Sequence, residues 1–192
     1  MSILILGLVL FLGVHSLRIF AGGWRDAQLA RLGEQRWKGL YSLASLAGFA
    51  LLVWGFGEAR TAGPVLYVPP VWARHTAALF TLPAFVLLAA AYVPGTRIKA
   101  AVGHPMVAGT VLWALGHLLA NGRLADLLLF GAFGLWAALS FRAARGRDRA
   151  AGRRYPPGPA SRDAVAVLVG AGAWGFFAFA AHGWLFGVRP FG

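Results

Sequence analysis

The chain contains no cysteine, and this absence excludes several classes of site. Disulfide bonds, thiolate nucleophiles, iron–sulfur clusters and cysteine-ligated zinc all require that residue. Acidic residues are also scarce, with six Asp and Glu against 18 Lys and Arg. No serine lies in a G-x-S-x-G motif, so nothing indicates a hydrolase triad. The polar groups of most interest are therefore the five histidines.

Hydrophobic residues make up 59% of the chain and form runs long enough to cross a bilayer. This pattern predicts an all-α, polytopic membrane helix bundle, with residues 1–192 forming a single transmembrane domain. The N-terminal run lacks the basic region and cleavage site of a secretory signal, so we expect it to be a retained helix. We predict six transmembrane helices, at about 2–20, 37–58, 73–93, 104–121, 123–141 and 164–186.

The distribution of Lys and Arg predicts the orientation of these six spans. Of the 18 basic residues, 14 lie in the first, third and fifth connections, and the other four lie elsewhere. The positive-inside rule then places the odd-numbered connections in the cytoplasm and both termini on the outer, periplasmic side. We read the basic stretch 141–159 as a linker, in which the arginine run 142–154 contacts anionic lipid headgroups. Without interleaved aromatic residues or a recognition motif, it does not indicate nucleic acid as a partner.

One glycine-rich stretch, Gly170–Gly175, matches G-x-G-x-x-G formally. It lies inside an apolar span and lacks the strand–turn–helix context of a dinucleotide site. We therefore interpret it as a site of close helix packing.

Two histidines, His104 and His117, lie on the same expected helix. They are 13 residues apart, which leaves about 220° between them at 100° per residue. They therefore cannot share one small ligand. His104 precedes Pro105, a favoured first helical residue, so we expect a capping or interfacial role for it. His117 is either a hydrogen-bonded buried group, a metal or haem ligand, or a proton carrier. Its helix face also carries Met106, Thr110, Trp113 and Asn121.

The remaining histidines differ in depth along their expected spans. His15 shares a face with Arg18 and lies roughly 6 Å to the cytoplasmic side of its midpoint, whereas His117 lies roughly 6 Å to the outer side. His182 and His75 also fall on the outer side, and His75 suits an interfacial role. His182 follows a face of small residues that would admit either a flat ring or another helix. By depth alone, His117 matches His182 and His75 better than His15.

Three stretches carry a family resemblance: "GLVLFLGVHSLRI", "RWKGLYSLASLAGFALLVWGFGEAR" and "HPMVAGTVLWALGHLLANGRLADLLLFGAFGLWA". They resemble the NnrU family of integral membrane proteins, which is associated in denitrifying bacteria with expression of nitrite and nitric oxide reductases. The family includes the plastid 15-cis-ζ-carotene isomerase. The resemblance implies a non-covalent haem b with His15 and His117 as the iron ligands, and His182 is the alternative second ligand. Where that relative is expected to have a cysteine, this chain has Ala114, so a switch to thiolate ligation is excluded.

We expect the protein to lie in the bacterial inner membrane, and we consider three alternative functions. The first is a haem-dependent cis–trans isomerase of a polyene lipid such as a cis-carotenoid, and the second is a non-enzymatic factor for denitrification enzymes. A membrane methyltransferase is a weaker third alternative, based on a His–Pro before a helix. The expected partners are membrane lipid and an apolar small molecule. No catalytic residue is predicted, and the sequence leaves the oligomeric state open.

Overall fold

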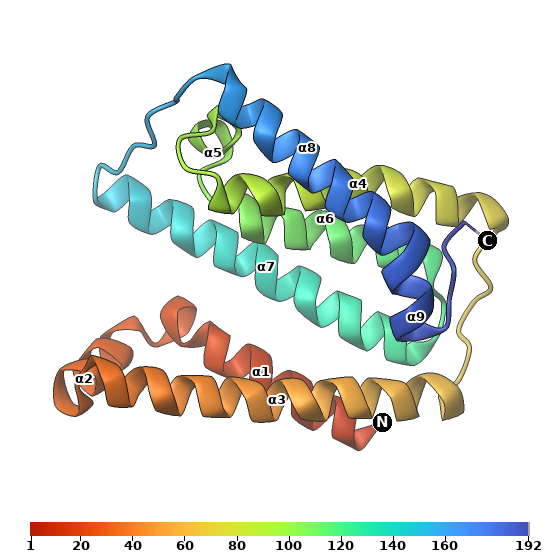
Figure 1. Ribbon diagram of the computed structural model, residues 1–192. Helices are drawn as coiled ribbons and strands as arrows, with labels where there is room; N and C mark the ends of the chain where they lie inside the picture. Colours follow the sequence, from red (N-terminus) through yellow and green to blue (C-terminus); the bar gives the residue numbers. More distant parts are fainter. Residues whose placement is uncertain (192) are drawn as a thin grey trace.

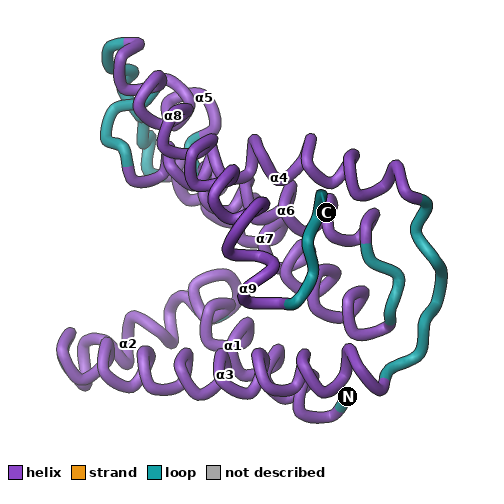
Figure 2. Tube along the Cα trace, turned by 45° about the vertical axis from the view of Figure 1, so that its right-hand side comes forward, coloured by secondary structure: helices purple, strands orange, loops and turns teal. Residues whose placement is uncertain are grey.

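The computed structural model describes residues 1–191, and within them the chain is helical apart from its connections and one isolated bridge, Val65 to Arg123 (Figures 1 and 2). Five helical segments are long and apolar enough to cross a membrane, and a sixth apolar helix is shorter. The chain is therefore a multi-pass membrane protein. The elements are α1 (Ser2–Phe20), α2 (Gly22–Leu32), α3 (Glu34–Ala62), α4 (Val71–Tyr92), α5 (Arg97–Val102), α6 (Pro105–Ala120), α7 (Leu124–Ala150), α8 (Ala160–Phe176), the π-helical turn η1 (Phe177–Ala181) and α9 (His182–Phe186).

Three elements differ from the arrangement predicted by the sequence. The charged segment after α1 forms helix α2 instead of an open connection. The basic stretch predicted as a linker is helical through Ala150, so only 151–159 connects α7 to α8. The short apolar helix is α6, whose 16 residues are fewer than a typical span needs, so the predicted count of six transmembrane helices is not confirmed.

The helices form two groups that are joined through α7. Helices α1 and α3 run antiparallel on one side, with α2 at their turn, and α4, α6 and α8 pack together on the other side (Figure 2). Helix α7 packs against α6 and also against α1 and α3. The main buried cluster lies at this junction, and it contains Leu4, Leu8, Leu12, Leu52, Ala59, Ala125, Leu129 and Phe130.

Glycines allow α1 and α3 to approach at backbone distance. A Cβ at Gly55 would lie 2.3 Å from the backbone nitrogen of Leu4, and one at Gly7 would lie 2.4 Å from that of Leu52. Small residues at helix interfaces permit such close packing in membranes. Gly170 has the same role between α8 and α4, because a Cβ there would lie 2.6 Å from the Cα of Val86.

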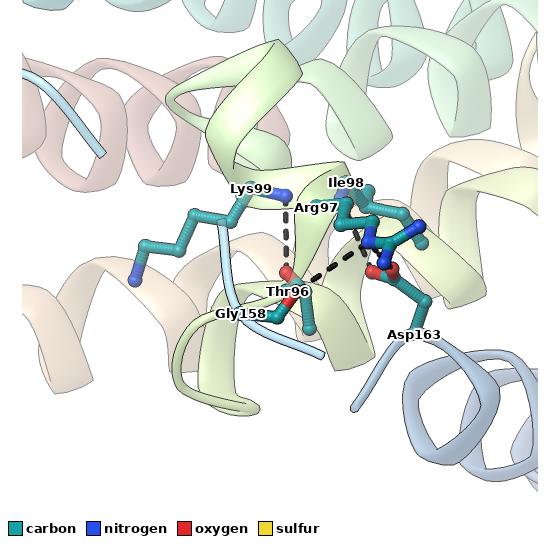
Figure 3. Close-up of polar contacts among 6 residues, drawn as sticks. All are labelled: Thr96, Arg97, Ile98, Lys99, Gly158 and Asp163. Carbon is teal, nitrogen blue, oxygen red and sulfur yellow. Dashed lines mark hydrogen bonds and ion pairs between the residues drawn. The ribbon is translucent and has the colours of Figure 1, made fainter. Parts of the chain in front are cut away.

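The basic connections and the termini lie at opposite ends of the bundle (Figure 1). At the basic end, α5 is tied to the start of α8, because the backbone N–H of Ile98 donates to the Asp163 carboxylate at 3.2 Å and Arg97 reaches the Gly158 carbonyl at 3.4 Å (Figure 3). The fully buried Thr96 caps α5 by accepting from the backbone N–H of Lys99 at 3.0 Å. These contacts hold the turn between α4 and α6, and hence the start of α6, in one place.

Candidate functional site

His15 is held in one tautomer by its own helix. Its Nδ1 donates to the Phe11 carbonyl, 2.7 Å away and one turn earlier. A carbonyl only accepts, so a neutral His15 carries its proton on Nδ1 and keeps the lone pair of Nε2 free. The ring lies against Phe11 at 4.3 Å and Tyr41 at 5.4 Å, measured between ring centroids, and Trp136 is the third aromatic neighbour.

His117 repeats this local arrangement on α6. Its Nδ1 donates to the Trp113 carbonyl at 2.8 Å, which again leaves Nε2 as the free nitrogen. The imidazole stacks on Phe130 with ring centroids 4.5 Å apart and contacts the Trp113 ring at 5.0 Å. A histidine whose second N–H is fixed by a carbonyl is the usual form of a metal-ligating imidazole. Both residues named by the family resemblance therefore have a ligand-competent tautomer.

A series of aromatic rings separates the two imidazoles. Phe11 contacts Phe133 at 5.8 Å, and Phe133 contacts Trp113 at 5.9 Å, measured between centroids. Within residues 1–191, no contact joins the rings of His15 and His117 directly. The structure therefore places them at two ends of one aromatic cluster between α1, α6 and α7.

A cavity of about 920 Å³ opens at the basic end, between α1–α3 on one side and α6–α7 on the other. His15 lines this cavity together with Tyr41, His104 and Asp148, whereas His117 is not part of its wall. The volume falls within the range of small-molecule sites. Its cationic lining residues are Arg18, Arg25, Lys38, Arg147 and Arg153.

His104 forms the polar wall of the cavity with a partner from α7. It is the N-cap residue of α6, and its Nε2 lies 2.8 Å from Oδ2 of Asp148. The hydroxyl of Tyr155 donates to the same carboxylate oxygen at 3.1 Å. Sequence reasoning missed Asp148, although one signal was present: it is the single acid in the run of arginines from 142 to 154.

The two other histidines lie toward the opposite end. His182 begins α9, donates from Nδ1 to the Val188 carbonyl at 2.7 Å, and packs on Phe186 at 5.0 Å. His75 stacks on Phe191 at 6.3 Å. Over residues 1–191 there is no group of three or more His, Asp or Glu side chains that could hold a metal ion.

Ala114 explains how close α6 and α7 come beside the aromatic cluster. Its side chain is fully buried, and its Cβ lies 3.2 Å from where a Cβ at Gly134 would stand. The position is one turn before His117 and faces α7. A small side chain therefore fits there, and a helix–helix contact occupies the place where the resemblance would set a cysteine.

A family model described as NnrU protein matches residues 3–190. No curated protein and no solved structure matches the chain.

Proposed function

The chain belongs to the NnrU family, and we propose that it is a haem-binding member of that family. The observation that carries this proposal is the matched pair of imidazoles. His15 and His117 each have Nδ1–H fixed by the carbonyl one turn earlier and each keep Nε2 free. Such imidazoles are good ligands for haem iron. When bound, haem b would supply a Lewis-acid or redox centre.

The residues fit this group unequally. His15 lines a cavity of about 920 Å³, which gives space beside this residue for a planar macrocycle. His117 lies in packed aromatic surroundings, and joining it to the same iron requires Phe133 and Phe11 to move aside. His182 remains the alternative partner for His117, on the grounds of its depth and its place near the same end of α6. We propose His117 and His15 as the ligands, with His182 as the substitute for His15.

The activity we propose is cis–trans isomerisation of a polyene lipid, as the resemblance implies. In this role the chain's residues would exclude water and hold the apolar substrate beside the ligand histidines. The cluster around Trp113 and Phe133 supplies an apolar wall of that kind.

Two observations indicate that the basic run 142–154 is not mainly a partner-binding surface. Arg147 and Arg153 line the cavity, and Asp148 between them is bound to His104. Part of the run therefore builds an internal site. A non-enzymatic role in expression or assembly of denitrification enzymes is the second candidate, and it rests on the exposed Arg142 and Arg149.

We further propose that α6 is a sixth crossing in the bacterial inner membrane, with the basic end in the cytoplasm and both termini in the periplasm. An even number of crossings brings the termini to one side, and both lie at the same end of the bundle (Figure 1). The 16 residues of α6 span about 24 Å at 1.5 Å per residue, less than the hydrocarbon thickness. The shortfall is tolerable because α4 and α7 flank this helix.

The test is a pyridine-haemochrome assay on protein purified gently after expression with adequate haem supply. We expect a b-type spectrum in the wild type, loss of haem in His117→Ala and weakened binding in His15→Ala. His75→Ala is the matched control, because His75 lies at the periphery, and it should keep the wild-type haem content. A colourless, folded wild type refutes the haem assignment. Full haem retention in His117→Ala would show that His117 is not a ligand. Loss of haem in His182→Ala, with haem retained in His15→Ala, would identify His182 as the second ligand.

A further inference from the structure

More positive than negative charge lines the cavity. Five cationic side chains line it, against the carboxylates of Glu34 and Asp148. Arg25 is paired with Asp26 at 2.7 Å and Lys38 with Glu34 at 2.6 Å, and Asp148 is engaged by His104 at 2.8 Å. The described residues thus leave Arg18, Arg147 and Arg153 without an ion pair around one open cavity. Such a surplus of positive charge raises the local concentration of anions.

Arg147 and Arg18 come from different helices and are joined at the cavity by a hydrogen bond. Nη1 of Arg147, on α7, donates to the backbone carbonyl of Arg18, on α1, at 3.3 Å. Within residues 1–191, no carboxylate forms an ion pair with Arg18, Arg147 or Arg153. Unpaired guanidinium groups brought together repel each other, and an anion between them relieves that repulsion and accepts charge-assisted hydrogen bonds.

An apolar groove continues from the cavity along α1. It has a volume of about 450 Å³ and shares Val14 and Leu17 with the cavity wall. Its other lining residues are apolar or glycine: Leu6, Val9, Leu10, Gly13 and Leu51. Leu6 and Val9 are 56% and 66% exposed, as expected for a helix face that contacts lipid. A cationic cavity is therefore continuous with an open apolar groove.

We propose that this joined site binds one anionic phospholipid, with its phosphate among Arg18, Arg147 and Arg153 and one acyl chain in the groove along α1. The cations match the headgroup, and the groove matches the chain. Neither feature alone selects a lipid, because a soluble phosphate needs no groove and a neutral lipid needs no cations. The basic end is also the end where anionic lipid concentrates if it faces the cytoplasm. The lipid site shares this cavity with His15, but none of the three arginines is a proposed haem ligand.

The test uses the full-length protein, exchanged into a zwitterionic detergent and titrated with phosphatidylglycerol or phosphatidylcholine during native mass spectrometry. We expect one phosphatidylglycerol retained per chain and no comparable retention of phosphatidylcholine. Arg18→Gln and Arg147→Gln should each weaken phosphatidylglycerol binding about tenfold, the effect of losing one charge-assisted hydrogen bond. Arg149→Gln is the matched control, because Arg149 lies on the same helix, is exposed and does not line the cavity.

A groove variant separates the lipid from a soluble phosphate. Gly13 has no atom within 4 Å of where its Cβ would stand, so Gly13→Leu fills the groove without disturbing a helix contact. This variant should weaken phosphatidylglycerol binding severalfold and leave any competition by glycerol phosphate unchanged. Unchanged lipid binding in Gly13→Leu, or glycerol phosphate binding as tightly as the lipid, overturns the assignment of the groove.

Two further results would overturn the proposal. One is equal weakening by Arg149→Gln and Arg147→Gln, which would reduce the site to general surface charge. The other is loss of haem absorbance in Arg18→Gln and Arg147→Gln with lipid binding unchanged, which would assign these cations to haem propionates. A colourless wild type that shows the expected lipid pattern refutes the haem proposal and leaves the lipid site standing.

Discussion

Replacing Gly55 by alanine tests the close packing of α1 and α3, on which the position of His15 depends. The added Cβ would lie 2.3 Å from the backbone nitrogen of Leu4 and 2.7 Å from its Cα. These are backbone atoms, so no side-chain rotation relieves the overlap. Ordinary van der Waals contact begins at 3.4 Å, so α1 must move away locally by about 1.1 Å.

The expected cost follows from two opposing effects. Overpacking a tight contact costs about 1–3 kcal/mol. Alanine is a better helix former than glycine by about 1 kcal/mol, which offsets part of that cost. We therefore expect Gly55→Ala to lower the free energy of unfolding by up to about 2 kcal/mol relative to the wild type.

The control is Gly57→Ala, two residues further along the same helix. No atom lies within 4 Å of where its Cβ would stand, so this variant keeps the gain in helix propensity without the overlap. Reversible unfolding in mixed micelles of increasing sodium dodecyl sulfate, followed by circular dichroism, compares the two variants with the wild type. A Gly55→Ala protein as stable as Gly57→Ala would refute the close contact between α1 and α3.

Two other predictions concern topology and the polar wall of the cavity. A reporter that works only in the periplasm should be active when it is fused to the C-terminus. A reporter that works only in the cytoplasm should be active when it is inserted in 151–159. A cytoplasmic C-terminus would contradict the proposed orientation. His104→Gln and Asp148→Asn should each lower the thermal unfolding midpoint, and the double variant should fall by less than the two effects combined because both remove the same contact. Strict additivity in that cycle would show that the two side chains do not interact.

Much of the fold could be predicted from composition. Long apolar runs with few charges specify membrane-length helices, and the structure has such helices close to the predicted ranges. The predicted helix boundaries are wrong where helices extend beyond the apolar part of the sequence. The stretch 142–150 is rich in alanine and arginine, which are good helix formers, but its charge led to its interpretation as a linker. The π-helical turn at Phe177–Ala181 follows no pattern that helical periodicity reveals.

The candidate site could be predicted only in its local parts. The separation of about 220° between His104 and His117 follows from helix geometry, and the structure places them in different surroundings. The link from His104 to Asp148 spans 44 residues and depends on how α6 and α7 cross. The cavity depends in turn on how α1 and α3 lean against α7, and a single sequence carries no direct signal for that angle.

The place of α7 in the bundle has a consequence for biogenesis. The walls of the cavity come from residues 14–42 and 104–153, and α7 is the helix that joins the early pair, α1 and α3, to the later group. Roughly 100 residues separate the end of α1 from the start of α7, which corresponds to about 5–20 s of translation. During that interval the nascent hairpin would expose the α1 face bearing His15 and Arg18 to the surrounding bilayer. The lipid that we propose for this cavity can therefore enter laterally from the membrane before α7 completes the wall, as a step of insertion rather than a later passage into a finished protein.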